Sequence, residues 1–282
     1  MSDKHRISIP VIHPYSLSKT VLSHGWVLLQ PFSWNSDNET LCRLEYLSDL
    51  NATVRIRIRQ QVPDRVVAEI TSLNRLSKQS LAALKRRLVA SLCSDVDLNS
   101  AVRIASRISP NVAKLLEAGG GRLLRGFSVY EDAVKTLFTT NASWKFTQMM
   151  VENLILECGV DGAFPTPLGV LELSEKQLRK RCRIGYRAAY LRKITEWFKD
   201  DPNRRIPKKL HGLGPYGMAH LRALYGHLGE IPIDSEVRSY CRDEFGFNTD
   251  HEIRENFEEW GEYQFLGYKL ERITKNSNWI GD

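Results

Sequence analysis

The chain has 282 residues, of which 42% are hydrophobic and 26% charged, and its formal net charge is +7. This length and apolar content suffice for one large or two modest folded domains, and they exclude an acidic disordered polymer. No apolar run approaches the roughly eighteen residues of a membrane-spanning helix, and the N-terminus lacks the apolar core of a signal peptide. We therefore expect an intracellular protein of the cytoplasm and nucleoid, or of the nucleus in a eukaryote, with no membrane partner.

The cysteines indicate a reducing compartment and no metal cluster. There are five of them, an odd number, and they lie far apart along the sequence: Cys42, Cys93, Cys158, Cys182 and Cys241. This spacing matches neither a disulfide framework nor the ligand set of a zinc or iron–sulfur site. We expect no cofactor of that kind.

The first third of the chain predicts a mixed α and β unit over residues 1–95. Residues 52–60 alternate strictly between apolar side chains and arginines, the pattern of a half-buried strand. Further strands are expected at 26–32, 41–47 and 65–70, with a turn at Pro63 and Asp64. Ser77 is placed to cap a helix in which leucines 81, 84, 88 and 92 form one stripe.

Helical periods replace the strand pattern from about residue 96 onward, so we expect a helical domain over 96–282. Three consecutive glycines, 119–121, predict a flexible joint. Helices are expected near 131–138, 143–157, 174–184 and 188–199, the third of them opened by a capping box of Ser174 and Gln177. The predicted fold class is mainly α, with a smaller N-terminal antiparallel sheet unit.

The net charge hides a strong asymmetry. Residues 234–282 carry twelve acidic and six basic side chains, whereas residues 176–222 carry fourteen Lys or Arg against three acidic residues. A run of like charge is usually a solvated helix face. An excess this large repels itself unless a polyanion neutralises it, and phosphate backbones are the commonest such partner.

A glycine turn follows this basic stretch. The segment 210–219 reads LHGLGPYGMA, with Gly212 and Gly214 before a new helix. Such glycines allow a tight reversal and close approach to a phosphate, which the N–H groups of the second helix would face. This predicts a helix-hairpin-helix over 206–221, in which Leu210 and Leu213 hold the two helices together. An ordinary turn with a glycine cap is the alternative.

Several ordered segments together resemble one family. After the glycine turn comes the Pro-apolar-Asp sequence of residues 232–234, and before it stand FPTP at 164–167 and GYRAAYL at 185–191. The order and spacing of these segments over about 123–270 resemble the helix-hairpin-helix DNA glycosylases of the 8-oxoguanine and alkylpurine types. The resemblance implies a base-excision-repair enzyme that acts on double-stranded DNA containing a damaged, purine-type base, and we expect a monomer. It does not identify the damaged base.

Asp234 is the candidate catalytic residue. Breaking an N-glycosidic bond leaves positive charge on the sugar, which a fixed carboxylate stabilises while it orients or deprotonates the attacking water. Asp234 could also simply cap the helix that begins at Ser235. The two roles are compatible, because helix N–H groups favour the ionised carboxylate that a cation needs.

Tyr216 occupies the position where the resemblance implies a lysine in glycosylases that also cut the backbone. A phenol cannot form the Schiff base that strand cleavage requires, so we expect base release without lyase activity. The alternative is a non-catalytic protein that uses the hairpin only to clamp distorted DNA. A lyase that uses Lys208 or Lys209 is disfavoured, because neither lies on the second helix of the hairpin, and both are expected to face phosphate instead.

The resemblance also implies contacts with DNA. Asn141 would fill the space left by the extruded base, although an Asn there could equally cap the following helix. Trp144 and Tyr216 are candidates for the base pocket, and Gly217 is a candidate for close approach to DNA. The backbone carbonyls of Lys208, Leu210 and Leu213 would hold a monovalent cation, Na⁺ or K⁺. The iron–sulfur branch of the family is not expected, because only Cys241 follows Asp234.

Overall fold

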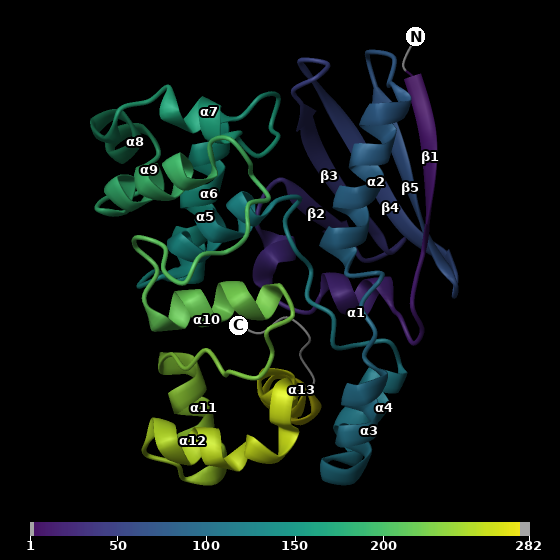
Figure 1. Ribbon diagram of the computed structural model, residues 1–282, viewed down its shortest axis with the longest axis vertical. Coiled ribbons are helices and arrows are strands. Elements are labelled where there is room, and N and C mark those ends of the chain that lie inside the picture. Colours follow the sequence, from purple (N-terminus) through teal and green to yellow (C-terminus); the bar gives the residue numbers. More distant parts are fainter. Residues whose placement is uncertain (1–2, 277–282) are drawn as a thin grey trace.

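The computed structural model describes residues 3–276, so the ends of the two predicted domains, 1–2 and 277–282, lie outside the described residues. The N-terminal part is a five-stranded antiparallel sheet in the order β1-β5-β4-β3-β2. Figure 1 shows helix α2 lying across this sheet. The strands are β1 (Asp3–Pro10), β2 (Phe32–Asn35), β3 (Thr40–Leu47), β4 (Ala52–Val62) and β5 (Arg65–Ser72).

The alternation in β4 has the predicted effect. Val54, Ile56 and Ile58 are fully buried, while the intervening arginines 55 and 57 face solvent. α2 (Lys78–Leu92) starts as predicted, because the Ser77 side chain accepts a hydrogen bond from the Ser80 N–H at 3.0 Å. The expected combination of an antiparallel sheet with a larger helical part is therefore confirmed.

One expectation for the N-terminal unit is wrong, and one of its strands was not predicted. The strand predicted at 26–32 is a short 3-10 helix, η1 (Gly25–Leu28), and β2 begins only at Phe32. Pro31 cannot donate to a strand ladder, and the Leu29 N–H instead donates to the Trp26 carbonyl at 3.0 Å. Strand β1 was not predicted, although the alternation of Ile7 and Ile9 was the available signal.

The flexible joint predicted at glycines 119–121 is wrong, because these glycines are packed where two backbone segments cross. All three are buried, and the Gly119 carbonyl accepts a hydrogen bond from the Ser16 N–H at 3.1 Å. A Cβ on Gly119 would lie 2.4 Å from the Tyr15 backbone. Glycine is required here because two backbone segments touch.

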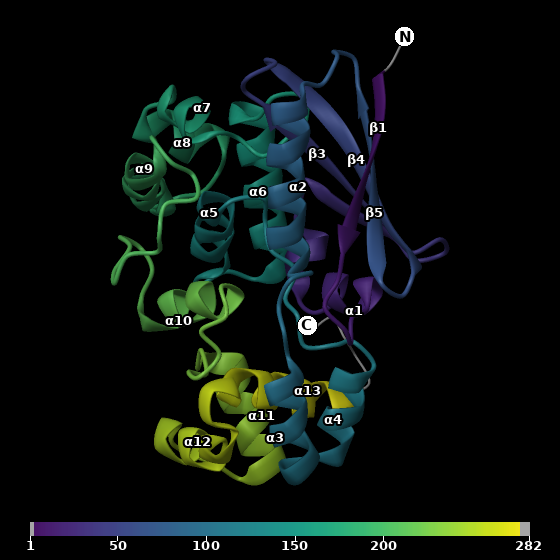
Figure 2. The same ribbon diagram turned by 45° about the vertical axis from the view of Figure 1, so that its right-hand side comes forward.

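The helices form two groups, which Figures 1 and 2 separate. The middle group lies beside the sheet and contains α5 (Val129–Thr139), α6 (Trp144–Cys158), α7 (Pro167–Leu171), α8 (Glu175–Arg181), α9 (Arg187–Phe198) and α10 (Pro215–Leu224). The second group contains α3 (Asn99–Ile108), α4 (Pro110–Glu117), α11 (Ser235–Phe245), α12 (Asp250–Asn256), η2 (Glu258–Tyr263) and α13 (Gln264–Asn276). The short α1 (Leu17–Val21) lies near the base of the sheet. The chain thus returns at its end to pack against helices that follow the sheet, while the predicted boundary at residue 95 stays a prediction.

The prediction of a helix before the glycine turn is wrong. Of the described residues, 199–214 contain turns and no helix, so the glycine turn joins an irregular segment to α10. Leu210 and Leu213 are buried as expected, and the Leu213 N–H donates to the Leu210 carbonyl at 3.1 Å. In the described part of the chain, no helix has the length and apolar character needed to cross a membrane.

Candidate active site

Two adjoining hollows meet at Asp234. The outer groove, about 870 Å³, lies between the 139–142 loop, the glycine turn and the start of α11. The inner pocket, about 380 Å³, is closed by residues from η1, α6, α10 and α13. Tyr216 and Asp234 line both hollows, as do Thr139, Ala142 and Glu236, so these residues lie at the junction.

The glycine turn owes its shape to two different requirements. Gly212 has a φ of 89°, and a Cβ there would lie 2.5 Å from the Tyr190 Cβ. Gly214 caps α10, and nothing lies within 4 Å of the position of its missing Cβ. The turn therefore presents open backbone at the start of α10, where the helix N–H groups attract an anion.

Gly217 has a packing role. A Cβ at this position would lie 3.2 Å from the Leu213 side chain and 3.7 Å from Thr136 of α5. The residue is buried, so the space saved by glycine is filled by the protein. Gly217 also lines the outer groove, so its close approach to DNA stays a prediction.

Asp234 caps α11 and faces the groove. Its carboxylate accepts a hydrogen bond from the Val237 N–H at 2.9 Å, and the side chain is half-buried. Helix N–H groups and the helix dipole stabilise a carboxylate at this position. The predicted capping role is confirmed, and the capping carboxylate also lines the groove, while its catalytic role stays a prediction.

Tyr216 lies beside Asp234. Burial, followed by the charge of Asp234 and a hydrogen bond to it, raises the pKa of the Tyr216 phenol. The ring stacks on His220, with ring centroids 6.0 Å apart. The tyrosine is therefore a protonated hydroxyl next to the candidate catalytic carboxylate.

The Asn141 loop is held from behind by a buried arginine. Arg187 donates to the Asn141 carbonyl at 3.0 Å and also to the Thr140 carbonyl. Asn141 itself is exposed and has a φ of 49°, while Ser143 caps α6. The capping alternative for Asn141 is therefore wrong, and its side chain is free to face the groove. The sequence motif at 185–191 includes Arg187, but its supporting role was not predicted.

Aromatic and imidazole rings form the walls of the inner pocket. Trp26 stacks on His24 at 4.9 Å between centroids, and it lies 5.2 Å from the His220 ring. Its Nε1 donates to the buried Asp132 carboxylate at 2.7 Å. Trp26 is 2% exposed and also lines this pocket. Trp144 lines it too and packs against Gly25, while its contact with an extruded base stays a prediction.

Several polar atoms around this pocket have no hydrogen-bond partner among the described residues. They are both ring nitrogens of His24, Nε2 of His220 and Nε1 of Trp144. Burial lowers the pKa of His24 well below its usual value and that of His220 to about 4, so both rings are neutral at neutral pH. Buried polar groups are normally satisfied, so this cluster is ready to bind the edge of a polar ligand.

Lys269 of α13 brings an amine to the same pocket. Burial, and then the charge of Arg272, lowers the pKa of Lys269 to about 8, so the amine is mostly protonated at neutral pH. Sequence reasoning missed this residue and His24, because neither belongs to a local motif.

The buried His220 gives a pH-dependent stability. Since its folded pKa of about 4 lies below the usual 6.5, the unfolded chain binds the proton more readily, and stability falls as the pH falls from 6.5 toward 4. When the pH is lowered from 7.5 to 5, we expect the free energy of unfolding of His220→Gln to fall by about 2 kcal/mol less than that of the wild type. Urea unfolding at both pH values measures this, and an equal loss in both proteins would contradict it.

The carbonyls predicted to hold a monovalent cation are partly engaged. The Lys208 carbonyl accepts from the Arg222 guanidinium at 2.9 Å, and the Leu210 carbonyl accepts from the Leu213 N–H. A guanidinium at Lys208 places a positive charge where the cation would bind, so this carbonyl does not fit a cation ligand. The Lys208 side chain lines a different cavity from Asp234.

The fold has clear counterparts among solved structures. The 3-methyladenine DNA glycosylase from Archaeoglobus fulgidus superposes with a TM-score of 0.72 at 16% identity, over 96% of this chain and 99% of the other. The 8-oxoguanine glycosylase/lyase from Clostridium acetobutylicum superposes in its apo form with a TM-score of 0.67 at 16% identity, over 96% and 97% of the two chains. The same enzyme in complex with double-stranded DNA containing cytosine opposite 8-oxoguanine gives 0.65 at 15% identity, over 98% of each chain.

This chain has the DNA glycosylase fold. No protein-family model matches the sequence, and no curated protein matches it either. The predicted resemblance is therefore confirmed at the level of the whole fold, including the N-terminal sheet, which the glycosylase structures cover almost completely. Within this glycosylase fold, the structure brings Asn141, Gly212, Gly214, Tyr216 and Asp234 to one groove.

Proposed function

We propose that the protein is a DNA glycosylase that removes a damaged purine from double-stranded DNA. The observation that carries the proposal is the Asp234 carboxylate, which stands between an open helix N-terminus suited to a backbone phosphate and a pocket large enough for one base. A protein that only clamps DNA needs the first feature and not the second.

The proposed reaction begins with extrusion of the damaged nucleotide, because its sugar carbon is shielded inside the base stack. The backbone at Gly214 and the start of α10 would hold a phosphate, and Asn141 would occupy the vacated space. As the glycosidic bond breaks, Asp234 stabilises the positive charge on the sugar and accepts a proton from the attacking water. The products are a free base and an abasic site.

The charge of the inner pocket favours one class of lesion. Lys269 and Arg272 line it together with Asp234 and Glu236, and Arg272 pairs with Glu236 at 3.7 Å. Lys269 is therefore the charge that repels a positively charged base such as 3-methyladenine. The Lys269 ammonium and the Trp144 N–H donate hydrogen bonds, which a neutral purine with a carbonyl oxygen accepts. We therefore propose 8-oxoguanine or hypoxanthine as the substrate class.

A panel of duplexes containing 8-oxoguanine, hypoxanthine, uracil, ethenoadenine or 3-methyladenine tests both proposals. We expect release of 8-oxoguanine or hypoxanthine, with 3-methyladenine released far more slowly. Lys269→Met should bring the release rate of 3-methyladenine closer to that of the neutral purines, because it removes the repelling charge. Lys275→Met on the same helix should leave the two rates as far apart as in the wild type. Duplex binding without release of any base would favour the DNA clamp.

Strand cleavage is a separate question. We propose that the enzyme is monofunctional, because Tyr216 cannot form a Schiff base and neither Lys208 nor Lys209 lines the groove or the inner pocket. Borohydride treatment of the enzyme with a lesion duplex should therefore trap no covalent adduct. Lys269 is the amine that lines the pocket, so an adduct that disappears in Lys269→Met would overturn this proposal and identify the nucleophile.

A further inference from the structure

A second cavity, of about 860 Å³, lies apart from the Asp234 site. It is enclosed by α2, the segment 125–129, the loop 203–208 and the C-terminal end of α10. The glycine turn opens the other end of α10, and a helix of ten residues is about 15 Å long. The two sites therefore lie at opposite ends of one helix.

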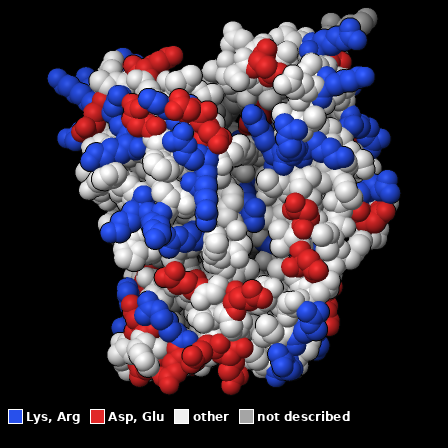
Figure 3. All heavy atoms as spheres, viewed as in Figure 1, with Lys and Arg blue, Asp and Glu red and all other residues white. Residues whose placement is uncertain are grey.

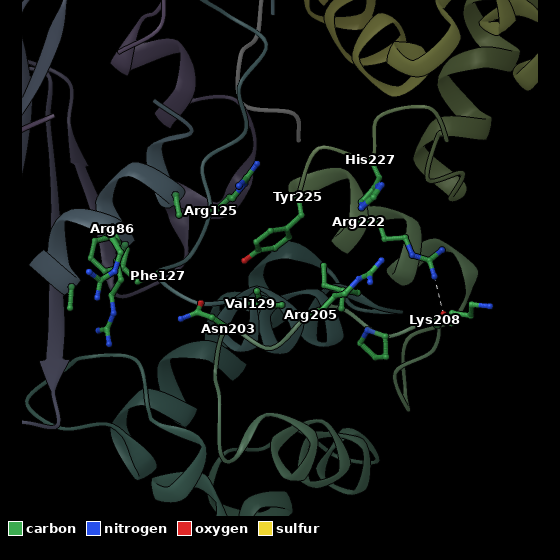
Figure 4. A pocket seen from close by; sticks show the side chains of 15 residues that line it. Arg86, Arg125, Phe127, Val129, Asn203, Arg205, Lys208, Arg222, Tyr225 and His227 are labelled. Carbon is green, nitrogen blue, oxygen red and sulfur yellow. Dashed lines mark hydrogen bonds between the residues drawn. The ribbon is translucent and has the colours of Figure 1, made fainter. Parts of the chain in front are cut away.

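The lining of this cavity is strongly basic and contains no acidic residue. Figure 3 shows Lys and Arg side chains gathered around the hollow between the sheet side and the middle helices, while acidic side chains gather at the lower end of the molecule. Figure 4 shows Arg86 on one side, Arg205, Lys208 and Arg222 on the other, and Arg125 between them.

Most of these cations lack a carboxylate partner. Arg87 pairs with Glu45 at 2.7 Å, and Arg222 donates only to the Lys208 carbonyl. Among the described residues, Arg86, Arg205 and the Lys208 side chain make no ion pair or hydrogen bond. Unpaired like charges in one cavity repel one another, so an anion that enters it is favoured.

Arg125 is the most informative of the group. Its Nε is buried without a hydrogen-bond partner in the described structure, and its guanidinium stacks on the Tyr225 ring at 4.9 Å. The Tyr225 hydroxyl donates to Asp132 at 2.8 Å, which fixes that ring in place. The arginine is thus held by stacking and has donors left for a ligand.

Apolar groups also line the cavity, among them Val129, Ile206 and the Tyr225 ring. Arginine forks suit phosphate oxygens, and a volume of this size suits a small molecule with a planar apolar part. The cavity lies at the end of α10 opposite the glycine turn, away from the helix N-terminus proposed to hold the DNA backbone. We propose that this cavity binds a nucleoside polyphosphate, independently of the glycosylase site.

Calorimetric titration of the full chain with ATP, inorganic tripolyphosphate and adenosine tests the proposal. We expect ATP to bind more tightly than tripolyphosphate, and adenosine to bind weakly. The variant Arg86→Gln/Arg125→Gln should lose ATP affinity by about tenfold or more, since each lost charged hydrogen bond is worth at least that factor. The control Arg103→Gln/Arg107→Gln removes the same charge from exposed positions on α3 and should bind ATP like the wild type.

The outcomes separate this site from the DNA surface. Absence of ATP binding, or equal binding by both double variants, would overturn the proposal. Equal affinity for tripolyphosphate and ATP would show that the cavity does not recognise the nucleoside, and this would overturn that half of the proposal. If the cavity variant loses duplex affinity while no small probe binds the wild type, the cavity belongs to the DNA path. Base release is measured separately, so ATP binding by a protein without glycosylase activity would leave this inference standing.

Discussion

Asp234→Asn should abolish base release while it leaves the fold and DNA binding intact. Asparagine caps a helix about as well as aspartate, so the hydrogen bond from the Val237 N–H is kept. The substitution removes the negative charge opposite the developing cation, and it removes the carboxylate that acts as general base toward the attacking water. We expect the single-turnover rate of base release to fall by about 10²- to 10³-fold or more, the effect of removing one preorganised electrostatic group.

The measurement uses the duplex from which the wild type releases its base fastest, together with fluorescence anisotropy on a duplex carrying an abasic analogue. Asp243→Asn, an exposed change on the same helix, is the matched control and should behave as the wild type. If Asp234→Asn lost duplex binding in proportion to activity, Asp234 would be a cap only. If Asp234→Asn still released the base at the wild-type rate, the proposed mechanism would be contradicted.

Arg43→Met should be strongly destabilising, because Arg43 joins the sheet to the middle helices through buried charges. Its guanidinium, on β3, binds both oxygens of Glu131 of α5 at 2.8 and 3.0 Å and Glu45 at 2.7 Å. Burial alone would raise the pKa of Glu131, but the charges of Arg43 and Lys135 hold it at about 2. Removing Arg43 leaves buried carboxylates undercompensated, and we expect a loss of about 3–5 kcal/mol in unfolding free energy.

Urea unfolding measures this loss, with Arg65→Met as a control. Arg65 pairs with Asp64 at 3.0 Å on the surface, where solvent screens the ion pair, so its loss should change the unfolding free energy little. Adding Glu131→Gln to Arg43→Met should recover part of the loss, because it removes one unpaired buried charge. A change below about 1 kcal/mol in Arg43→Met would contradict a structural role for this cluster.

Local patterns predicted much of the fold. Alternation identified β4, capping side chains identified the starts of α2 and α8, and the glycines identified the turn before α10. These features depend on neighbours a few residues apart, so the sequence carries them directly. The expected hairpin helix before Gly212 failed because its charged and apolar residues follow no cap signal, and the segment is held instead by contacts with α10 such as Arg222 to Lys208.

The candidate site also contains residues that a local pattern predicts and residues that only folding brings together. Tyr216 and Asp234 were predicted because they belong to one short stretch with recognisable spacing. His24, Trp26 and Lys269 were not predicted as pocket residues, because they come from opposite ends of the chain and only packing brings them together. The same holds for Arg125, whose neighbours in the basic cavity come from α2, the loop 203–208 and α10.

Patterns in the amino-acid sequence were thus enough to predict the alternating strands, the glycine turn, the aspartate that follows it and the overall excess of basic residues. Only folding showed that the turn lacks a first helix, that neutral imidazoles and a lysine line the inner pocket, and that six basic side chains line a second cavity. The difference lies in the distance along the chain over which each feature is set. Backbone turns and caps are set by adjacent residues, whereas burial, pKa shifts and charge clustering depend on residues that folding brings together from more than a hundred positions apart.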